Sequence, residues 1–146
     1  MIARLCGLAV DARAATRTRD PVELAIATRW IAANLVSIRG ARLVIEGMVP
    51  AGGRLFGARV ASLGDLLAAL AAVPALVDAA TLPRHWRLGL RALGIPMLDR
   101  PVPAALAAGA SVVALAPTAG SSVDVVVAGD GGYRVRVADA QCRRAA

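Results

Sequence analysis

Apolar residues recur at helical spacing through much of the chain, beginning after a charged lead-in. Asp20, Pro21 and Glu23 suit the first turn of a helix, because aspartate caps free amides, proline fits the first helical position and acidic groups favour the positive end of the helix dipole. The spacing predicts one amphipathic helix that ends at Gly40. Its stripe comprises Leu24, Ile26, Ala27, Trp30, Ile31, Asn34, Leu35 and Ile38. Such a helix either packs on a sheet or lies on a membrane surface.

Three further helices are predicted, with short apolar runs between them. One helix begins at Ser62, a capping residue, and breaks at Pro74, and the others cover 83–93 and 102–108. The apolar runs lie at 43–46, 54–57, 75–78, 95–98 and 111–115. We interpret them as strands or, for the fourth, a strand or extended segment, and the first two flank a turn rich in glycine. Strands separated by helices of this length indicate βαβ units and a mostly parallel sheet.

The last part of the chain alternates apolar and polar residues instead. Two runs, 123–128 and 133–137, flank the glycine-rich turn at 129–132, which favours a β-hairpin. In the second run, apolar residues alternate with Arg134 and Arg136, as is typical of a strand with one buried and one wet face. The whole pattern predicts an α/β fold with a mostly parallel central sheet, flanking helices and a C-terminal β-hairpin.

The chain length indicates one domain. A chain of 146 residues can bury a real core but is too short for two substantial domains. We expect a single domain over 20–140, after a loosely ordered lead-in at 1–19 with at most a short helical turn, and before a frayed tail at 141–146. The longest apolar stretch, 66–77, contains Pro74 and falls short of the ~20 residues that a membrane-spanning helix needs. Since the first residues also make a poor signal peptide, we expect a cytoplasmic protein.

The charge of the chain is strongly basic. The net charge of +7 comes from 17 basic residues, all of them arginine. Either the arginines attract anionic lipid head groups or donor phosphates, or they decorate a solvated surface. Aromatic residues make up only 3% of the chain, so it lacks the stacking platforms of single-stranded nucleic-acid binders, and we expect no nucleic-acid partner. Cys6 and Cys142 form no CxxC pair, and we expect no metal site.

The loop after the second predicted strand carries the most specific signal. Its residues 59–65 resemble the catalytic loop of the glycerophospholipid acyltransferase family, the enzymes that acylate lysophosphatidic acid. In that family an NHxSxxD-type loop supplies a histidine that removes a proton from the acceptor hydroxyl and an aspartate that orients the histidine. Ser62 and Asp65 match the serine and the aspartate, whereas Arg59 and Val60 stand where the family has asparagine and histidine. Because valine has no proton to exchange, the loop lacks the family's general base.

The resemblance extends over about 30–122 and lies in the order of the segments. Arg100, after the segment 93–99, matches an arginine that helps hold the acceptor's phosphate, and an arginine fork pairs well with phosphate oxygens. The alternative is that Arg100 pairs with Asp99. The family's glutamate-containing turn corresponds to 116–122, which has no glutamate. That loop, with Thr118 and Gly120, either offers amides and hydroxyls to an anion or simply connects two strands.

The resemblance implies an acyltransferase-like protein of phospholipid metabolism. It assigns Asp65 to catalysis, and Ser62, Arg100, Thr118 and Gly120 to substrate binding. An acyl-CoA or acyl-carrier thioester would be the donor, a lysophospholipid the acceptor, and the inner face of the membrane a peripheral site of contact. Without the histidine and the glutamate, we expect a pseudoenzyme with impaired catalysis, truncated on its C-terminal side.

Two alternatives to an acyltransferase-like pseudoenzyme remain. One is a non-catalytic protein that binds anionic lipid or a partner acyltransferase, and the other is a decayed reading frame with no selected function. His85 is the single histidine of the chain and the remaining candidate for a base, although nothing in the sequence places it beside Asp65.

Overall fold

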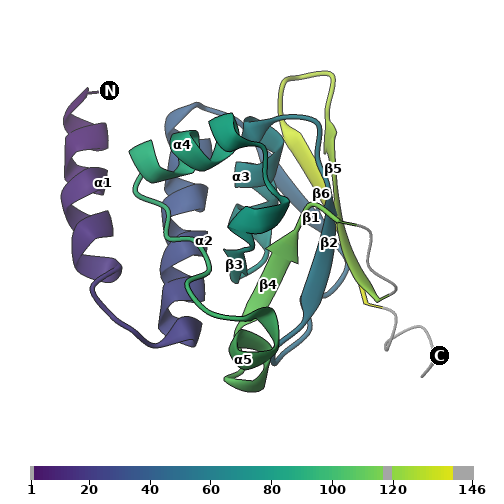
Figure 1. The fold of residues 1–146 in the computed structure, drawn as a ribbon. Coiled ribbons are helices and arrows are strands. Elements are labelled where there is room, and N and C mark those ends of the chain that lie inside the picture. The colour runs from purple at the N-terminus through teal and green to yellow at the C-terminus, as the bar shows by residue number, and fades with distance from the viewer. Residues whose placement is uncertain (1, 117–119, 140–146) are drawn as a thin grey trace.

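A computed structural model describes residues 2–116 and 120–139. Helices and strands are interspersed along the chain, as in an α/β protein (Figure 1). The helices are α1 (Ile2–Ala15), α2 (Pro21–Ile38), α3 (Leu63–Ala72), α4 (Arg84–Ala92) and α5 (Val102–Ala107), with a 3-10 turn η1 at Ala79–Thr81. The strands are β1 (Leu43–Glu46), β2 (Leu55–Arg59), β3 (Ala75–Val77), β4 (Ser111–Ala114), β5 (Ser121–Val127) and β6 (Tyr133–Ala138).

Within the described residues the strands form one curled sheet of six, in the order β1-β6-β5-β2-β4-β3. Every neighbouring pair is parallel except β5 and β6, which form the antiparallel C-terminal hairpin. The predicted α/β fold with a mostly parallel sheet and a hairpin at its end is therefore confirmed. On β6, Tyr133, Val135 and Val137 are buried while Arg134 and Arg136 are exposed, which confirms the predicted wet face.

The first two strands do not pair with each other, although they flank a short turn in the sequence. β1 lies at one edge of the sheet and pairs only with β6, whereas β2 lies between β5 and β4. On the other side, the segment predicted at 95–98 contributes only a single parallel bridge between Met97 and Val77.

Helix α2 begins and ends where the sequence predicts. The Asp20 carboxylate accepts a hydrogen bond from Val22 N at 3.0 Å, and the chain leaves the helix through Gly40 at φ 72°. The predicted stripe is partly wrong, since Ile26 and Trp30 are 57% and 41% exposed. The buried face, which includes Leu24, Ala25, Ala27, Thr28, Ile31, Ala32, Leu35 and Val36, packs on α3 and β3. Of the two alternatives for this helix, the structure has the packed one.

The lead-in at 1–19 is more ordered than the sequence predicts. A helix of 14 residues, α1, fills most of it and packs beside α2 at the outer side of the molecule (Figure 1). Only Ala12 of this helix is buried, so α1 carries almost no apolar period that a sequence pattern could reveal. The expectation of a loosely ordered segment is corrected accordingly. The tail predicted to be frayed, 141–146, lies outside the described residues.

Helix α3 forms the centre of the core. Its residues from Asp65 to Ala72 are all buried, because α2 covers it on one side and the sheet on the other. Phe56 of β2, Leu66 and Leu70 of α3, and Ile31 of α2 are completely buried here. The loop between β2 and α3 is thereby fixed between two rigid elements.

Candidate functional site

Ser62 and Asp65 meet at the carboxyl end of β2, where the chain turns into α3. Ser62 Oγ accepts a hydrogen bond from Asp65 N at 3.2 Å, and Asp65 Oδ2 accepts one from Ala61 N at 3.0 Å. This arrangement is close to a capping box, except that Asp65 accepts from the amide of Ala61, one residue before the capping Ser62. Asp65 is only 5% exposed. The structure brings these two predicted site residues together and engages both of them in capping α3.

The two residues that depart from the family motif have structural partners of their own. Val60 is partly buried and packs against the hydrophobic core. The Arg59 side chain is exposed, and its Nε lies 3.7 Å from Asp124 Oδ1 on the neighbouring strand β5. Neither position presents a group that could accept a proton beside Asp65.

Two polar groups from distant segments approach the first turn of α3. A Cβ on Gly64 would lie 2.9 Å from the Tyr133 hydroxyl and 3.0 Å from Arg39 Nη1, so the ends of both side chains lie close to the helix start. An arginine, a hydroxyl and a helix start would together attract an anion. The buried Asp65 carboxylate in the same turn opposes it, and we assign no ligand to this point.

Arg100 lies far from this loop. Its Nε pairs with Asp99 Oδ1 at 3.1 Å, and its Nη2 donates to the Arg19 carbonyl, just before α2, at 3.0 Å. The loop lies at the other end of α2, since Gly64 approaches Arg39. The 18 residues of α2 separate the two ends by about 27 Å at ~1.5 Å per residue. The structure therefore does not bring Arg100 to Ser62 and Asp65.

For the remaining predicted residues, the structure shows no hydrogen bond to Ser62 or Asp65 among the described residues. Thr118 lies outside the described residues. Gly120 is exposed just before β5, and a Cβ added to it would meet nothing within 4 Å. His85 is exposed on α4, where its ring meets Trp86 edge-on at 6.2 Å, and no hydrogen bond among the described residues joins it to Asp65.

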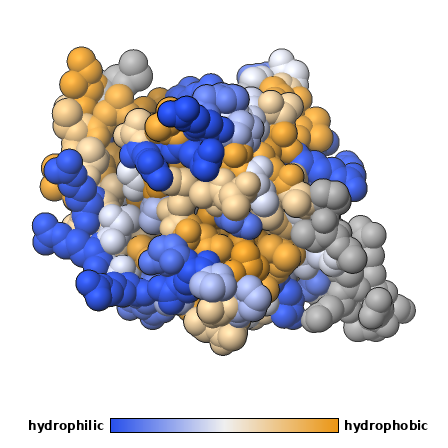
Figure 2. Space-filling view, viewed as in Figure 1, coloured by the Kyte–Doolittle hydropathy of each residue, from blue (hydrophilic) through white to orange (hydrophobic). Residues whose placement is uncertain are grey.

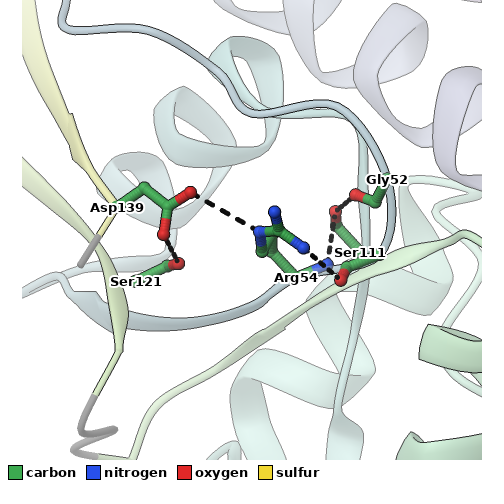
Figure 3. Close-up of polar contacts among 6 residues, drawn as sticks. Gly52, Arg54, Ser111, Ser121 and Asp139 are labelled. Carbon is green, nitrogen blue, oxygen red and sulfur yellow. Dashed lines mark hydrogen bonds and ion pairs between the residues drawn. The ribbon is translucent and has the colours of Figure 1, made fainter. Parts of the chain in front are cut away.

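A second polar cluster lies at the opposite end of the parallel strands (Figure 3). Arg54 Nε and Asp139 Oδ2 form an ion pair of 3.5 Å, and Ser121 Oγ donates to Asp139 Oδ1 at 3.1 Å. Ser111 Oγ accepts from Arg54 N and donates to the Gly52 carbonyl, both at 3.1 Å. These contacts join the starts of β2, β4 and β5 to the end of β6, so the cluster has a structural role.

The arginines of α4 form one further group of polar side chains, which was not among the predicted site residues. Arg84, Arg87 and Arg91 line a hollow of about 210 Å³ together with Leu88. Their spacing of three and four residues was visible in the sequence, but a search for apolar periodicity does not detect a charged stripe. Within residues 2–116 and 120–139, no group of three or more His, Cys, Asp or Glu side chains could hold a metal ion.

Comparison with known proteins adds no relative. No protein-family model matches the chain, and neither a curated protein nor a solved structure matches it. In the part of the chain that the structure describes, no helix has the length and apolar character needed to span a bilayer. The assignment of a function therefore rests on the geometry of the chain and on the resemblance of its loop.

Proposed function

We propose that the protein is a non-catalytic binding protein built on a scaffold like that of the glycerophospholipid acyltransferases. It holds a phosphate-bearing lipid or acyl thioester without transferring the acyl group. One observation carries the proposal: Val60, at the position of the family's base, packs against the core, while Asp65 accepts a hydrogen bond from a backbone amide.

The chemistry explains why this arrangement is inert. A general base must lie within hydrogen-bond reach of the proton that it removes, about 2.6–3.2 Å between heavy atoms. Valine offers no acceptor, and the family's aspartate has no imidazole to orient here. Any residual acyl transfer would depend on positioning alone, slower by roughly two to four orders of magnitude than transfer assisted by a base.

The basic charge supports the binding half of the proposal. A net charge of +7 favours anionic head groups and thioester phosphates over neutral ligands. The proposal places the protein in the cytoplasm, in peripheral contact with the inner face of the membrane, as a pseudoenzyme of phospholipid metabolism. The proposal does not include binding of nucleic acid by base stacking.

Acyl transfer from a long-chain acyl-CoA to lysophosphatidic acid tests the catalytic half. We expect no turnover above buffer for the native protein and measurable turnover for Val60→His, because the imidazole would stand at the position of the family's base, five residues before Asp65. The control is Val60→His combined with Asp65→Asn, which keeps the cap but removes the carboxylate that orients the base.

Co-sedimentation with phosphatidylcholine vesicles, with and without phosphatidic acid, tests the binding half. Native protein that is inert but sediments with the acidic vesicles supports the proposal. Turnover by the native protein that Asp65→Ala abolishes would overturn it, and His85 would then be the first candidate for the base. Absence of binding together with an inert Val60→His variant would also contradict it.

A further inference from the structure

The outer face of α4 carries three arginines that form no ion pair with a carboxylate in the described part of the chain. Arg84, Arg87, Leu88 and Arg91 lie on one face, because their spacing follows the helical repeat, and they line a hollow of about 210 Å³. On the opposite side of α4, Leu90 is completely buried and Trp86 packs against the core. Hydrophilic atoms accordingly gather over α4 at the top of Figure 2.

Arg87 has a donor that no residue between 2 and 116 or between 120 and 139 satisfies. Its Nε is buried and has no hydrogen-bond partner among the described residues. None of Arg84, Arg87 and Arg91 forms an ion pair with a described carboxylate. A buried donor without an acceptor costs free energy, so the unmatched Nε–H marks a place for an acceptor from outside the chain.

The charges on α4 also favour the binding of an anion. The helix contains no acidic residue, begins at Pro83 without a side-chain cap, and has Arg84 in its first turn, at the positive end of the dipole. Like charges three and four residues apart repel each other. Arg13 of α1 adds another positive charge, since it lines the adjoining depression together with Arg91. A bound anion would relieve each of these costs.

We propose that this hollow binds a phosphoryl group, with Arg87 Nε donating to one oxygen and Arg84 and Arg91 neutralising the charge from either side. Guanidinium forks match phosphate oxygens in geometry. The Cα atoms of Arg84 and Arg91 lie about 10 Å apart along the helix, at ~1.5 Å per residue, so long side chains can converge on one group between them. The inference deepens the proposed function and rests on it for the nature of the ligand, a phosphate-bearing compound.

Titration calorimetry with inorganic pyrophosphate tests the site. We expect Arg87→Gln to weaken binding by about ten- to hundred-fold, the usual effect of losing hydrogen bonds to a charged group. Arg87→Lys keeps the charge but loses the fork, so it should also bind more weakly than the native protein. Arg42→Gln is the matched control, because Arg42 is exposed before β1 and forms no ion pair among the described residues.

Arg84→Gln and Arg91→Gln keep the test decisive if Arg87 variants fold poorly, since both side chains are exposed. Equal affinity in the native protein and these variants, or native-like affinity in Arg87→Lys, would overturn the assignment. So would a native protein that binds neither pyrophosphate nor phosphatidic-acid vesicles.

Vesicles of phosphatidylcholine with and without phosphatidic acid separate the two sources of the phosphoryl group. Sedimentation that needs Arg87 and is competed by pyrophosphate supports a lipid head group. Dependence on Arg87 for pyrophosphate alone supports a free phosphate compound. If Arg87→Gln changes neither the affinity for pyrophosphate nor the sedimentation with acidic vesicles, the site is wrong while the proposed function stands. Turnover by the native protein would instead overturn the proposed function alone.

Discussion

At the scale of single residues, the two side chains that match a catalytic motif serve the backbone. Ser62 accepts from the amide of Asp65, and Asp65 accepts from the amide of Ala61. The first hydrogen bond satisfies an amide that the first turn of a helix leaves without a partner, and the second holds the amide just before the capping residue. The same serine and aspartate spacing therefore suits a helix start even where no histidine is present.

Replacing the capping serine should destabilise the fold. We expect Ser62→Ala to lower the free energy of unfolding by about 1 kcal/mol, the usual cost of losing an N-cap. Urea denaturation followed by circular dichroism measures the effect. Ser37→Ala is the control, because Ser37 is exposed within α2 and its hydroxyl caps no helix. Equal effects of the two substitutions would contradict the capping role.

At the scale of elements, the bend after β1 depends on a glycine. Gly47 has φ 95°, and a Cβ on it would clash with the backbone carbonyl oxygen of Val137 on β6. Gly40, after α2, has φ 72°, but a Cβ added to it would have no atom within 4 Å. The two glycines therefore share a conformational requirement and differ in packing.

This pair gives a matched prediction. Gly40→Ala should cost about 1–2 kcal/mol, the price of a left-handed conformation in a residue with a side chain. Gly47→Ala should cost clearly more, since the backbone of β6 must also move. Urea denaturation of both variants checks the difference. Equal costs would show that β1 and β6 are less closely apposed than described.

Most elements could be predicted because their signals are local. Asp20, Ser62 and Pro74 mark ends of α2 and α3 by capping or by breaking a helix, and the structure confirms each of them. α1 was missed, since a helix with one buried residue shows little period. The pairing of β1 with β6 could not be predicted, because turn chemistry says nothing about partners distant in the sequence.

Only the part of the candidate site that lies within one loop could be predicted from the sequence. Ser62 and Asp65 lie within one turn, so the sequence places them together. The distance of Arg100 from this loop depends on how α2 and α3 pack. Arg29 Nε of α2 donates to the Ala71 carbonyl near the end of α3, and Arg39 after α2 approaches the start of α3 at Gly64. This antiparallel packing, which no motif encodes, separates Arg100 from the loop.

At the scale of the whole molecule, a buried ion pair links segments from both halves of the chain. Asp139, after β6, pairs with Arg54 and accepts from Ser121. We expect Asp139→Ala to lower the free energy of unfolding by about 1–3 kcal/mol, because it leaves Arg54 and Ser121 without this acceptor in a largely buried place. Thermal or urea unfolding measures the change.

Asp11→Ala is the control for the change in net charge. Asp11 is exposed on α1 and forms no ion pair or hydrogen bond among the described residues. We expect its effect to stay within about 0.5 kcal/mol, as for most surface substitutions. A loss in Asp11→Ala as large as that in Asp139→Ala would assign the effect to charge rather than to the cluster.

The edge position of β1 also sets the order of events during synthesis. Glu46 on β1 and its partner Arg136 on β6 lie 90 residues apart along the chain. A ribosome releases β1 well before β6, and until β6 emerges β1 lacks the described strand with which it pairs. Contacts of such separation form slowly, and an unpaired strand with exposed apolar side chains such as Val44 invites association with other chains. A nascent chain stalled before β6 should therefore be the species that needs a chaperone.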